Sequence, residues 1–458
     1  MNNFRKLILL IGDANLIYIA LFLALTIRHG DLSFWPESKI TAFFFQFSFI
    51  SLFWILILYI LDFYEIPLFK RVFDFFRNLL VFIFLASILG ATYFYLKPET
   101  GITPKTILFL DVLIFSVFLC FWRYIFYRIL KIKNFREKII VVGFRPGLEE
   151  LTDKHSLSRA GYEIVAFFSP DASFSEKLLA FVGMAKYGVI SDINKLKEVT
   201  EKEKVSSVVF PRFLEGNEKI IHQVFSNLPL KLNYVSFADF YENLTKKVPI
   251  GAVNEVWFLE NVSRSEKKVD DVLKRGFDIA FSLFCLLASI LLFPFIALAI
   301  KLDSPGSLFY LQKRVGKDGK EFTLYKFRSM KESPDQYKEP WRERNRNQVT
   351  RVGRFLRRTH LDEIPQFWSI LKGDISFVGP RPEWEKLARE FEKGIPFYPL
   401  RYLIKPGFTG WAQLHYIAST SLEEAKEKFK YDLYYIKNRN FFMDLGIILK
   451  TIRIIFRQ

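Results

Sequence analysis

Four long apolar runs fill the first 130 residues, and they limit how the chain can fold more than any other feature. They cover residues 7–27, 40–61, 72–96 and 106–130. A helix rises about 1.5 Å per residue, so about 20 apolar residues cross the roughly 30 Å hydrocarbon core of a bilayer. All four runs reach that length. The sequence therefore predicts a membrane protein whose first domain, residues 1–136, is a bundle of four transmembrane helices.

Lys and Arg residues are distributed unevenly around these runs. Nine of them lie before the first run, between the second and third, and after the fourth, whereas the two loops on the other side carry four. Cytoplasmic loops are enriched in Lys and Arg because these cations cross the membrane poorly. We therefore expect both ends of the four-helix domain to lie in the cytoplasm.

Short apolar segments alternate with helix-like segments over residues 137–262. The strand-like segments are residues 138–143, 163–168, 205–210 and 231–237, and the helix-like ones include 192–202 and 217–227. This alternation predicts a Rossmann-like α/β domain with a parallel sheet. The turn after the first strand, Gly143-Phe144-Arg145-Pro146-Gly147, lacks the three-glycine fingerprint of dinucleotide sites. A non-catalytic, structural or regulatory role is favoured, with nucleotide binding as the alternative.

A fifth apolar segment, residues 279–300, has 22 residues without a charge. Basic residues flank both of its ends, which favours a return to the same side of the membrane. Pro294 lies about two thirds along it and would break the helical hydrogen bonds and bend the axis. We expect a re-entrant helix over about residues 274–302. The alternative, an ordinary fifth span, would carry everything after Lys301 out of the cell.

The basic charge of the chain is concentrated rather than diffuse. The formal net charge is +17, and residues 311–360 alone contain 15 Lys and Arg against 6 Asp and Glu, a net charge of +9. Three interpretations fit such a region: a solvated face that contacts anionic lipid, a nucleic-acid site, or a pocket for phosphate-bearing substrates. The chain contains no recognised nucleic-acid-binding module, so a nucleic-acid partner is not expected.

Two adjacent carboxylates, Asp362 and Glu363, follow this basic region directly. Pro365 fits the first turn of a short helix that begins beside them, and helix starts attract anions. Neighbouring side chains on a helix diverge by about 100°, so the two carboxylates should have different tasks. One can attack phosphorus while the other holds a divalent cation. A pair of surface carboxylates without catalytic function is the plainer alternative.

A series of ordered motifs surrounds this pair and resembles the bacterial sugar transferases, also called monotopic polyprenyl-phosphate phosphoglycosyl transferases. The resemblance runs over almost all of residues 272–458. Its motifs are Lys274-Arg275-Gly276-Phe277-Asp278, Arg314-Val315-Gly316, Lys326-Phe327-Arg328-Ser329-Met330, Leu361-Asp362-Glu363-Ile364-Pro365-Gln366, Gly379-Pro380-Arg381-Pro382 and Lys405-Pro406-Gly407-Phe408-Thr409-Gly410. It implies a mostly α-helical catalytic domain over residues 263–458. Four spans followed by a Rossmann-like domain also resemble the long form of the family.

The resemblance implies a reaction between a UDP-sugar and undecaprenyl phosphate. Asp362 would attack the β-phosphate, release UMP and carry the sugar phosphate as a covalent intermediate until the lipid phosphate takes it. Glu363 would bind Mg²⁺, with Asp362 as a further ligand and Mn²⁺ as the alternative ion. Phosphates would be held by Arg357, Arg381, Lys326 and Arg328. For the last two, plain attraction to the membrane is the alternative.

The resemblance carries further expectations about place and partners. Asp432 is a weaker substrate-binding candidate, and a structural salt bridge there is the alternative. The protein would lie in the bacterial inner membrane as a homodimer, with its catalytic domain on the cytoplasmic face. The reaction would initiate the assembly of an exopolysaccharide, capsule, O-antigen or other glycoconjugate.

Two other functions are possible for a chain with this domain organisation. A membrane-anchored NAD-dependent nucleotide-sugar dehydratase or epimerase also joins four spans to a Rossmann domain, but it needs the glycine fingerprint and usually a Tyr-x-x-x-Lys pair. Residues 139–260 contain neither. A non-enzymatic scaffold of the polysaccharide machinery would not need the Asp362–Glu363 pair and its arginines.

Overall fold

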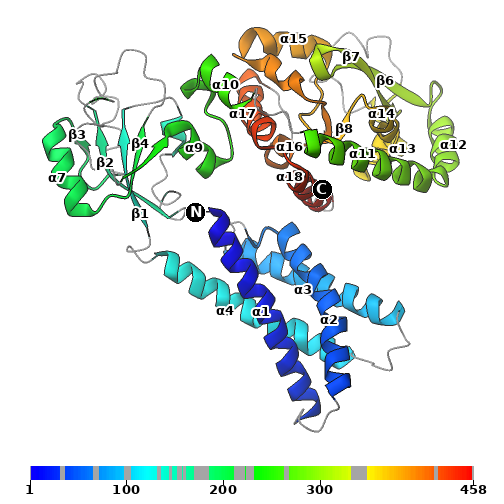
Figure 1. Cartoon of the computed structure of the whole chain (residues 1–458). Coiled ribbons are helices and arrows are strands. Elements are labelled where there is room, and N and C mark those ends of the chain that lie inside the picture. Colours follow the sequence, from blue (N-terminus) through cyan, green and yellow to red (C-terminus); the bar gives the residue numbers. More distant parts are fainter. Residues whose placement is uncertain are drawn as a thin grey trace. The chain divides into compact units, whose positions relative to one another are not determined.

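The structure is a computed structural model, and it divides into two compact units, Met1–Leu244 and Thr245–Gln458 (Figure 1). Each unit is described by itself. The described residues are 2–30, 37–64, 72–96, 105–131, 136–143, 147–151, 157, 161–169, 185–210, 222, 232–262, 268–331, 348–416 and 421–455.

The first unit begins with four helices, α1 (Asn2–His29), α2 (Glu37–Ile60), α3 (Val72–Leu96) and α4 (Lys105–Lys131). They pack around a shared core that includes Leu21, Trp54, Phe82 and Phe115. Their outer faces are also apolar, with Phe22, Phe45, Phe84 and Phe121 all more than half exposed. A helical bundle that is apolar inside and outside has lipid as its solvent.

Three segments in these helices are long and apolar enough to cross a membrane: Lys6–Arg28, Phe73–Leu96 and Thr106–Phe126. The fourth apolar segment, Phe44–Ile60 in α2, is shorter within the described residues. The prediction of a membrane protein is therefore confirmed.

The interior of the helical bundle contains a buried ion pair. The two terminal guanidinium nitrogens of Arg123 in α4 donate to the carboxylate of Asp13 in α1, at 2.8 and 2.6 Å. Both side chains are at most 1 % exposed. The guanidinium also lies 5.6 Å from the centre of the Tyr64 ring. Breaking one partner would leave the other charge uncompensated in a dry interior, so the pair holds α1 and α4 in register.

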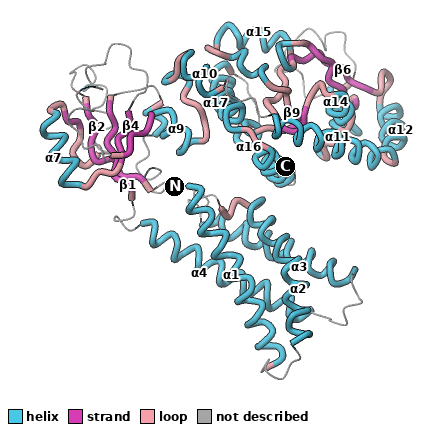
Figure 2. The backbone as a smooth tube through the Cα atoms, viewed as in Figure 1, coloured by secondary structure: helices cyan, strands magenta, loops and turns pink. Residues whose placement is uncertain are grey.

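A parallel sheet forms the rest of the first unit (Figure 2). Its strands are β1 (Glu137–Val142), β2 (Tyr162–Phe168), β3 (Val189–Ile190), β4 (Ser207–Phe210) and β5 (Asn233–Ser236). The order is β3-β2-β1-β4-β5 and every pairing is parallel. The predicted parallel sheet is thus confirmed, and its order is that of doubly wound nucleotide-binding folds.

The last four residues of β1 and the last five of β2 are apolar and buried, so both faces of the sheet are covered there. Ile140, Val165, Phe168 and Val208 pack with Leu196 of helix α7 (Ile193–Glu203) in one core. The other elements of this region are the short 3₁₀ helix η5 (Leu148–Leu151) and α9 (Phe237–Thr245). Residues 144–146, in the turn after the first strand, and nearly all of the helix-like segment 217–227 lie outside the described residues.

The second unit is mostly helical and contains two small sheets. Its elements are η7 (Ile250–Ala252), α10 (Glu255–Asn261), α11 (Lys268–Ile290), α12 (Phe293–Asp303), β6 (Phe309–Val315), η9 (Lys317–Gly319), β7 (Glu321–Phe327), α13 (Arg351–Arg358), η12 (Leu361–Glu363), α14 (Gln366–Lys372), β8 (Ser376–Val378), α15 (Glu385–Gly394), η13 (Tyr398–Leu403), β9 (Gly407–Thr409), α16 (Trp411–His415), α17 (Leu422–Asn438) and α18 (Phe441–Ile455). Strands β6 and β7 form an antiparallel hairpin, and β8 pairs with β9 in parallel.

The first residues of this unit belong to it by direct contacts. The Val248 N–H donates to the Lys430 carbonyl at 3.1 Å, and the indole N–H of Trp411 donates to the Lys246 carbonyl at 3.1 Å. The rings of Phe258 and Phe397 lie 4.6 Å apart. Residues 245–262 therefore pack against the rest of the second unit.

The fifth apolar segment is broken in two. Helices α11 and α12 meet at an angle of 62° across Leu291 and Leu292. Pro294 lies in the first turn of α12, where its missing N–H costs no helical hydrogen bond. Both helices expose large apolar side chains, such as Phe284, Leu287 and Phe295. This geometry fits a broken span or a re-entrant segment.

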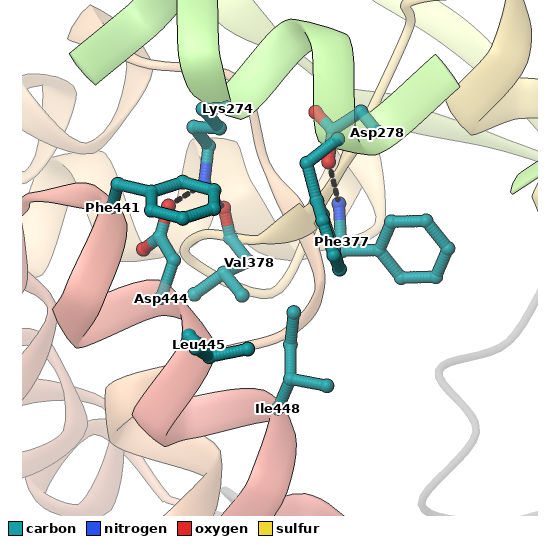
Figure 3. A pocket seen from close by; sticks show the side chains of 9 residues that line it. Lys274, Asp278, Phe377, Val378, Phe441, Asp444, Leu445 and Ile448 are labelled. Carbon is teal, nitrogen blue, oxygen red and sulfur yellow. Dashed lines mark hydrogen bonds and ion pairs between the residues drawn. The ribbon is translucent and has the colours of Figure 1, made fainter. Parts of the chain in front are cut away.

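The turn of α11 just before its apolar part is tied to three other elements (Figure 3). The ammonium of Lys274 donates to the Val378 carbonyl at 2.8 Å and pairs with Asp444 of α18. The carboxylate of Asp278 accepts the Phe377 N–H at 3.0 Å. Arg275 donates to the carbonyls at the end of α14. These three charged residues attach the first turns of α11, called the root of α11 below, to the rest of the second unit.

Candidate active site

A cavity of about 240 Å³ lies where the β6–β7 hairpin meets α13 and η12. Three kinds of group line it: cations, a carboxylate, and neutral polar or apolar side chains. The residues that the argument uses are Tyr310, Gln312, Arg314, Lys326, Arg328, Ser329, Arg357 and Asp362. The cavity thus collects residues that are up to 52 positions apart, Tyr310 and Asp362.

Helix α13 approaches the end of β7 closely because Gly353 has no side chain. A Cβ at this position would lie 2.0 Å from the Ser329 carbonyl oxygen. The helix starts at Thr350, whose hydroxyl accepts the Gly353 N–H at 2.9 Å. The close contact lets the Nε–H of Arg357 donate to the Ser329 hydroxyl at 2.8 Å. Arg357 is thereby held at the cavity.

Asp362 lies in the one-turn helix η12, between α13 and α14. His360 precedes this turn with a left-handed φ of 55°, which ends α13 and reverses the chain. Asp362 is 7 % exposed, and its Oδ1 atom has no hydrogen-bond partner within the described part of the chain. An unpartnered buried carboxylate oxygen at a cavity wall is costly for folding and available for chemistry.

Burial raises the pKa of Asp362 above its ordinary value, and the negative charge of Glu363 adds to that rise. The positive charges of Lys326 and Arg357 lower the pKa of Asp362 and partly offset burial. A carboxylate with a raised pKa is more basic than an exposed one. The two cations offset part of this desolvation and favour the ionised form.

Glu363 points to Lys326 instead of sharing the environment of Asp362. The two side chains form an ion pair across β7 and η12. Burial alone would raise the pKa of Glu363, but the charges of Lys326 and Arg381 outweigh it and hold the pKa below its ordinary value. The pKa values of the two neighbouring carboxylates are therefore shifted in opposite directions.

The two carboxylates fit a Mg²⁺ ion that takes only part of its ligands from protein. Oxygen donors are the ligands that Mg²⁺ prefers, and it commonly keeps waters and substrate phosphates in its shell. Within the described residues, no group of three or more His, Cys, Asp or Glu side chains forms a closed metal site. An ion here would use Asp362, Glu363 or both, with phosphate oxygens and water completing its shell.

Arg381 lies in a turn that is clamped from several sides. Arg401 donates to its backbone carbonyl at 3.0 Å, and Arg314 donates to the next carbonyl, that of Pro382, at 2.9 Å. Strands β8 and β9 meet here with no side chain between them, because a Cβ at Gly407 would lie 2.0 Å from the Gly379 nitrogen. The rigid turn keeps the Arg381 charge close enough to lower the pKa of Glu363.

Arg328 lines the same cavity, but its guanidinium donates hydrogen bonds to the backbone. It donates to the carbonyls of Ser304 at 2.6 Å and Pro305 at 2.8 Å, and it is 4 % exposed. These bonds attach the end of α12 to β7. The structure thus shows a structural role for Arg328, and the phosphate-binding role stays a prediction.

Asp432 lies in α17, in a buried network of charges. Its carboxylate pairs with Arg401 at 2.9 Å, and Lys428 pairs with Glu383 at 2.7 Å. The side chains of Asp432 and Arg401 are 2 % and 4 % exposed. Asp432 does not line the cavity around Asp362. This arrangement matches the structural salt bridge that the sequence left open for it.

We expect Asp432→Ala to lower the stability of the protein by roughly 3–5 kcal/mol, because Arg401 would keep a buried charge without its partner. Thermal unfolding of the purified protein would measure the loss. Since Asp432 is remote from the cavity, KM for the nucleotide substrate should change less than 3-fold at a temperature where the variant is folded. A large rise in KM without a loss of stability would instead assign Asp432 to the substrate.

Arg314 and Ser329 also line the cavity, although the sequence motifs that contain them were given no site role for these two residues. Arg314 is half-buried, and desolvation lowers its pKa to about 10 despite the nearby carboxylate of Glu383. The residue pattern of the β6–β7 hairpin does indicate that Arg314 lies at the site. Tyr310, Gln312 and Arg314 alternate along β6, and Tyr310 pairs with Lys326 across the strands. Alternate residues share one face of a strand.

The profile of the family described as bacterial sugar transferase matches residues 269–458. Over 190 residues the chain is 40% identical to the exopolysaccharide production protein PSS of Rhizobium leguminosarum bv. phaseoli, which covers 40% of this chain and 95% of that relative. The chain belongs to the bacterial sugar transferase family. The family region begins with α11 and contains the cavity, both carboxylates and the Arg381 turn.

Two longer relatives of the bacterial sugar transferase family carry names that state a reaction. One is a UDP-N-acetylgalactosamine-undecaprenyl-phosphate N-acetylgalactosaminephosphotransferase of Aeromonas hydrophila, 40% identical over 183 residues, which are 40% of this chain and 43% of the relative. The other is a UDP-glucose:undecaprenyl-phosphate glucose-1-phosphate transferase of Escherichia coli (strain K12), 40% identical over 186 residues, 40% of each chain. The chain thus spans about two fifths of the length of these two relatives.

Proposed function

We propose that this chain transfers a sugar 1-phosphate from a UDP-sugar to undecaprenyl phosphate, with release of UMP. The transfer would initiate the assembly of an exopolysaccharide, capsule, O-antigen or other glycoconjugate. The names of the two longer relatives support the proposal, since they agree on the acceptor lipid and on a UDP-sugar donor. They differ in the sugar, N-acetylgalactosamine in one and glucose in the other.

The observation that carries the proposal is Asp362 itself. Its Oδ1 atom is buried, has no partner in the described structure and lies at a cavity lined by Lys326, Arg328 and Arg357. Cations around a lone carboxylate favour a substrate that brings negative charge, and a diphosphate is such a substrate. The carboxylate can then act as a nucleophile while the cations balance the phosphate charge.

The reaction proceeds in two displacements at the same phosphorus atom. In the first, a carboxylate oxygen of Asp362 bonds to the β-phosphorus, the bond from that phosphorus to the bridging oxygen breaks, and UMP leaves with the electron pair. In the second, a phosphate oxygen of the lipid attacks the same phosphorus, and the Asp362 carboxylate leaves. The product is undecaprenyl diphosphate sugar, and no oxidant or reductant is needed. Arg357 and Arg381 hold phosphate oxygens in both steps.

Mg²⁺ is the cofactor of this proposal, with Mn²⁺ as an alternative, and Glu363 is its main protein ligand. When bound, the ion neutralises phosphate charge that would repel the attacking carboxylate. Lys326 holds Glu363 in place by their ion pair and keeps it ionised. Glu363 can thus offer an oxygen to a cation without prior loss of a proton.

The membrane arrangement of the proposal has four spans and one re-entrant segment. Helices α1 to α4 cross the inner membrane, and the α11–α12 pair enters one leaflet and returns; the 62° bend between its helices and the basic residues at both of its ends support this arrangement. The catalytic unit then lies on the cytoplasmic face, where UDP-sugars are made. A homodimer stays a prediction from the resemblance to the long form.

Topology gives a direct prediction. A single cysteine introduced at Ser333 should resist a membrane-impermeant maleimide added to intact cells, and react once the cells are opened. A cysteine introduced at Lys97, in a loop predicted to lie outside, serves as the control and should react in intact cells. Equal labelling of both positions in intact cells would mean that the α11–α12 pair crosses the membrane.

UMP release tests the function. Membranes that contain the protein are incubated with undecaprenyl phosphate, Mg²⁺ and a panel of UDP-sugars: UDP-glucose, UDP-galactose, UDP-N-acetylglucosamine and UDP-N-acetylgalactosamine. We expect release from at least one donor, dependent on the lipid phosphate. No release from any donor would favour the scaffold role. The dehydratase or epimerase alternative would show up as a change in the sugar without UMP, and the absent glycine fingerprint speaks against it.

A further inference from the structure

A second polar cavity of about 250 Å³ lies at the root of α11, lined by none of the residues that line the Asp362 cavity. Its walls come from the first turns of α11, the η9 turn of the hairpin, and the segments around β8 and β9. Charged residues dominate the lining, with five cations, Lys274, Arg275, Lys317, Lys405 and Arg439, against two carboxylates, Asp271 and Asp278.

Both carboxylates and two of the cations in this cavity are already engaged. Asp271 pairs with Arg439, and Asp278 accepts the Phe377 N–H at 3.0 Å. Lys274 pairs with Asp444. Within the described part of the chain, Arg275, Lys317 and Lys405 have no ion-pair partner, and the nearby carboxylate of Asp374 pairs with Lys372 at 3.2 Å. Within the described residues, three cations of the lining therefore have no ion pair, against one lining carboxylate, Asp278, that also has none.

Arg275 and Lys405 approach each other across Gly373. A Cβ at Gly373 would lie 3.2 Å from the Lys405 ammonium and 3.3 Å from a guanidinium nitrogen of Arg275. Arg275 is fixed there because it donates to the carbonyls of Ile370 and Leu371, both at 2.8 Å. Burial and then the charge of Arg275 lower the pKa of Lys405, with a smaller contribution from Lys317, while the charges of Asp278 and Asp374 offset part of the shift. Like charges crowded in this way stabilise a bound anion.

The hydroxyl of Ser376 gives a second, independent sign of a ligand. Ser376 lines this cavity, is 0 % exposed, and its Oγ atom has no hydrogen-bond partner within the described residues. Buried hydroxyls are nearly always paired, so an unpaired one in a polar cavity indicates a missing partner. A phosphate oxygen can accept this hydrogen bond while the three cations balance its charge.

The place of the cavity favours a lipid as the source of that phosphate. Lys274, Arg275 and Asp278 line it, and the uncharged run of α11 begins at the next residue, Ile279. In a re-entrant helix this boundary lies at the level of the lipid headgroups. Val272 and Leu273, on the same turns, are 72 % and 51 % exposed and apolar. Acyl chains can cover such residues while the headgroup enters the cavity.

We propose that this cavity binds the phosphate of an anionic phospholipid headgroup, through Arg275, Lys317, Lys405 and the Ser376 hydroxyl. The site is separate from the Asp362 cavity, and it would anchor the root of the re-entrant helix at a fixed depth. The proposal rests on the insertion of α11 proposed above, and it does not depend on the sugar transfer.

The test is a titration of the full-length protein in detergent with dioleoylphosphatidylglycerol, followed by native mass spectrometry. The double variant Lys317→Ala/Lys405→Ala should bind the lipid roughly 30-fold more weakly, about 5-fold for each lysine removed. The single variant Lys317→Ala should bind the lipid about 5-fold more weakly. Because Lys317 is exposed on a turn, this variant keeps the test valid if the double variant unfolds. Lys313→Ala/Lys320→Ala, with the same change of charge on the same hairpin, is the matched control and should bind as wild type.

Three outcomes would overturn the proposal. One is equal binding by the Lys317/Lys405 variant and the Lys313/Lys320 control. Another is displacement of the phospholipid by millimolar inorganic phosphate, which would make the cavity a site for free anions. The third is displacement by equimolar undecaprenyl phosphate, which would make it the acceptor site. UMP release is measured in parallel on each variant, so that failure of the transfer reaction is distinguished from failure of lipid binding.

Discussion

Asp362→Asn is expected to abolish UMP release, with a loss of about four orders of magnitude or more, while the protein remains folded. An amide oxygen is a poor nucleophile and carries no charge, so the first displacement cannot start. The shape of the side chain is nearly unchanged. Since Oδ1 accepts no hydrogen bond in the described structure, the substitution breaks none there and also removes a buried charge. UMP release and thermal unfolding are the measurements.

Asp318→Asn is the control for this variant, because Asp318 is exposed on the hairpin turn and its left-handed φ of 56° suits asparagine equally well. It should keep wild-type activity. The intermediate can be followed with a donor labelled in the sugar and no acceptor lipid. Label should stay on the wild-type protein and not on Asp362→Asn. Near-normal turnover by Asp362→Asn would contradict the covalent mechanism.

Lys326→Met is expected to lower kcat/KM by about 10²- to 10³-fold and to move the acid limb of its pH profile to higher pH. The Lys326 ammonium favours the ionised form of Asp362, so its removal raises the pKa of Asp362 further above the ordinary value. At a given acidic pH, a smaller fraction of Asp362 is then ionised and able to attack. Glu363 also loses its ion-pair partner, so its depressed pKa rises as well.

The measurement for this second prediction is kcat/KM between about pH 5 and 9. Lys313→Met is the matched control, since Lys313 lies on the same hairpin, is 72 % exposed and pairs with Glu321 at the surface. Its profile should coincide with that of the wild type. If the acid limb of Lys326→Met stays in place or moves to lower pH, Lys326 does not act on Asp362 through its charge, and phosphate binding alone would explain any loss.

Local patterns in the sequence were sufficient for much of the architecture. Apolar runs of about 20 residues are stable mainly in lipid, and short apolar segments that alternate with amphipathic ones pair in parallel. The break near Pro294 follows from the missing N–H of one residue. These predictions depend on periodicity and on single side chains, which are visible without knowledge of any contact.

The candidate site was only partly predictable. Asp362 and Glu363 are adjacent in sequence, so their proximity needed no fold. That Lys326 pairs with Glu363, while Arg328 is directed to the Ser304 and Pro305 carbonyls, could not be read from a motif that contains both cations. Strand alternation and the approach of α13 at Gly353 decide which cation faces which carboxylate.

Asp432 is a second residue whose role the sequence could not decide. Its sequence context allowed a substrate ligand or a salt bridge, and only the packing of α17 against η13 puts Arg401 at 2.9 Å from it. The sequence by itself determined that the chain enters membranes and that two carboxylates follow a basic region. The tertiary structure decided which charges are neutralised internally and which remain for a phosphate. The reason is physical: burial and partners set the protonation and the availability of a charged group, and both come from residues far apart along the chain.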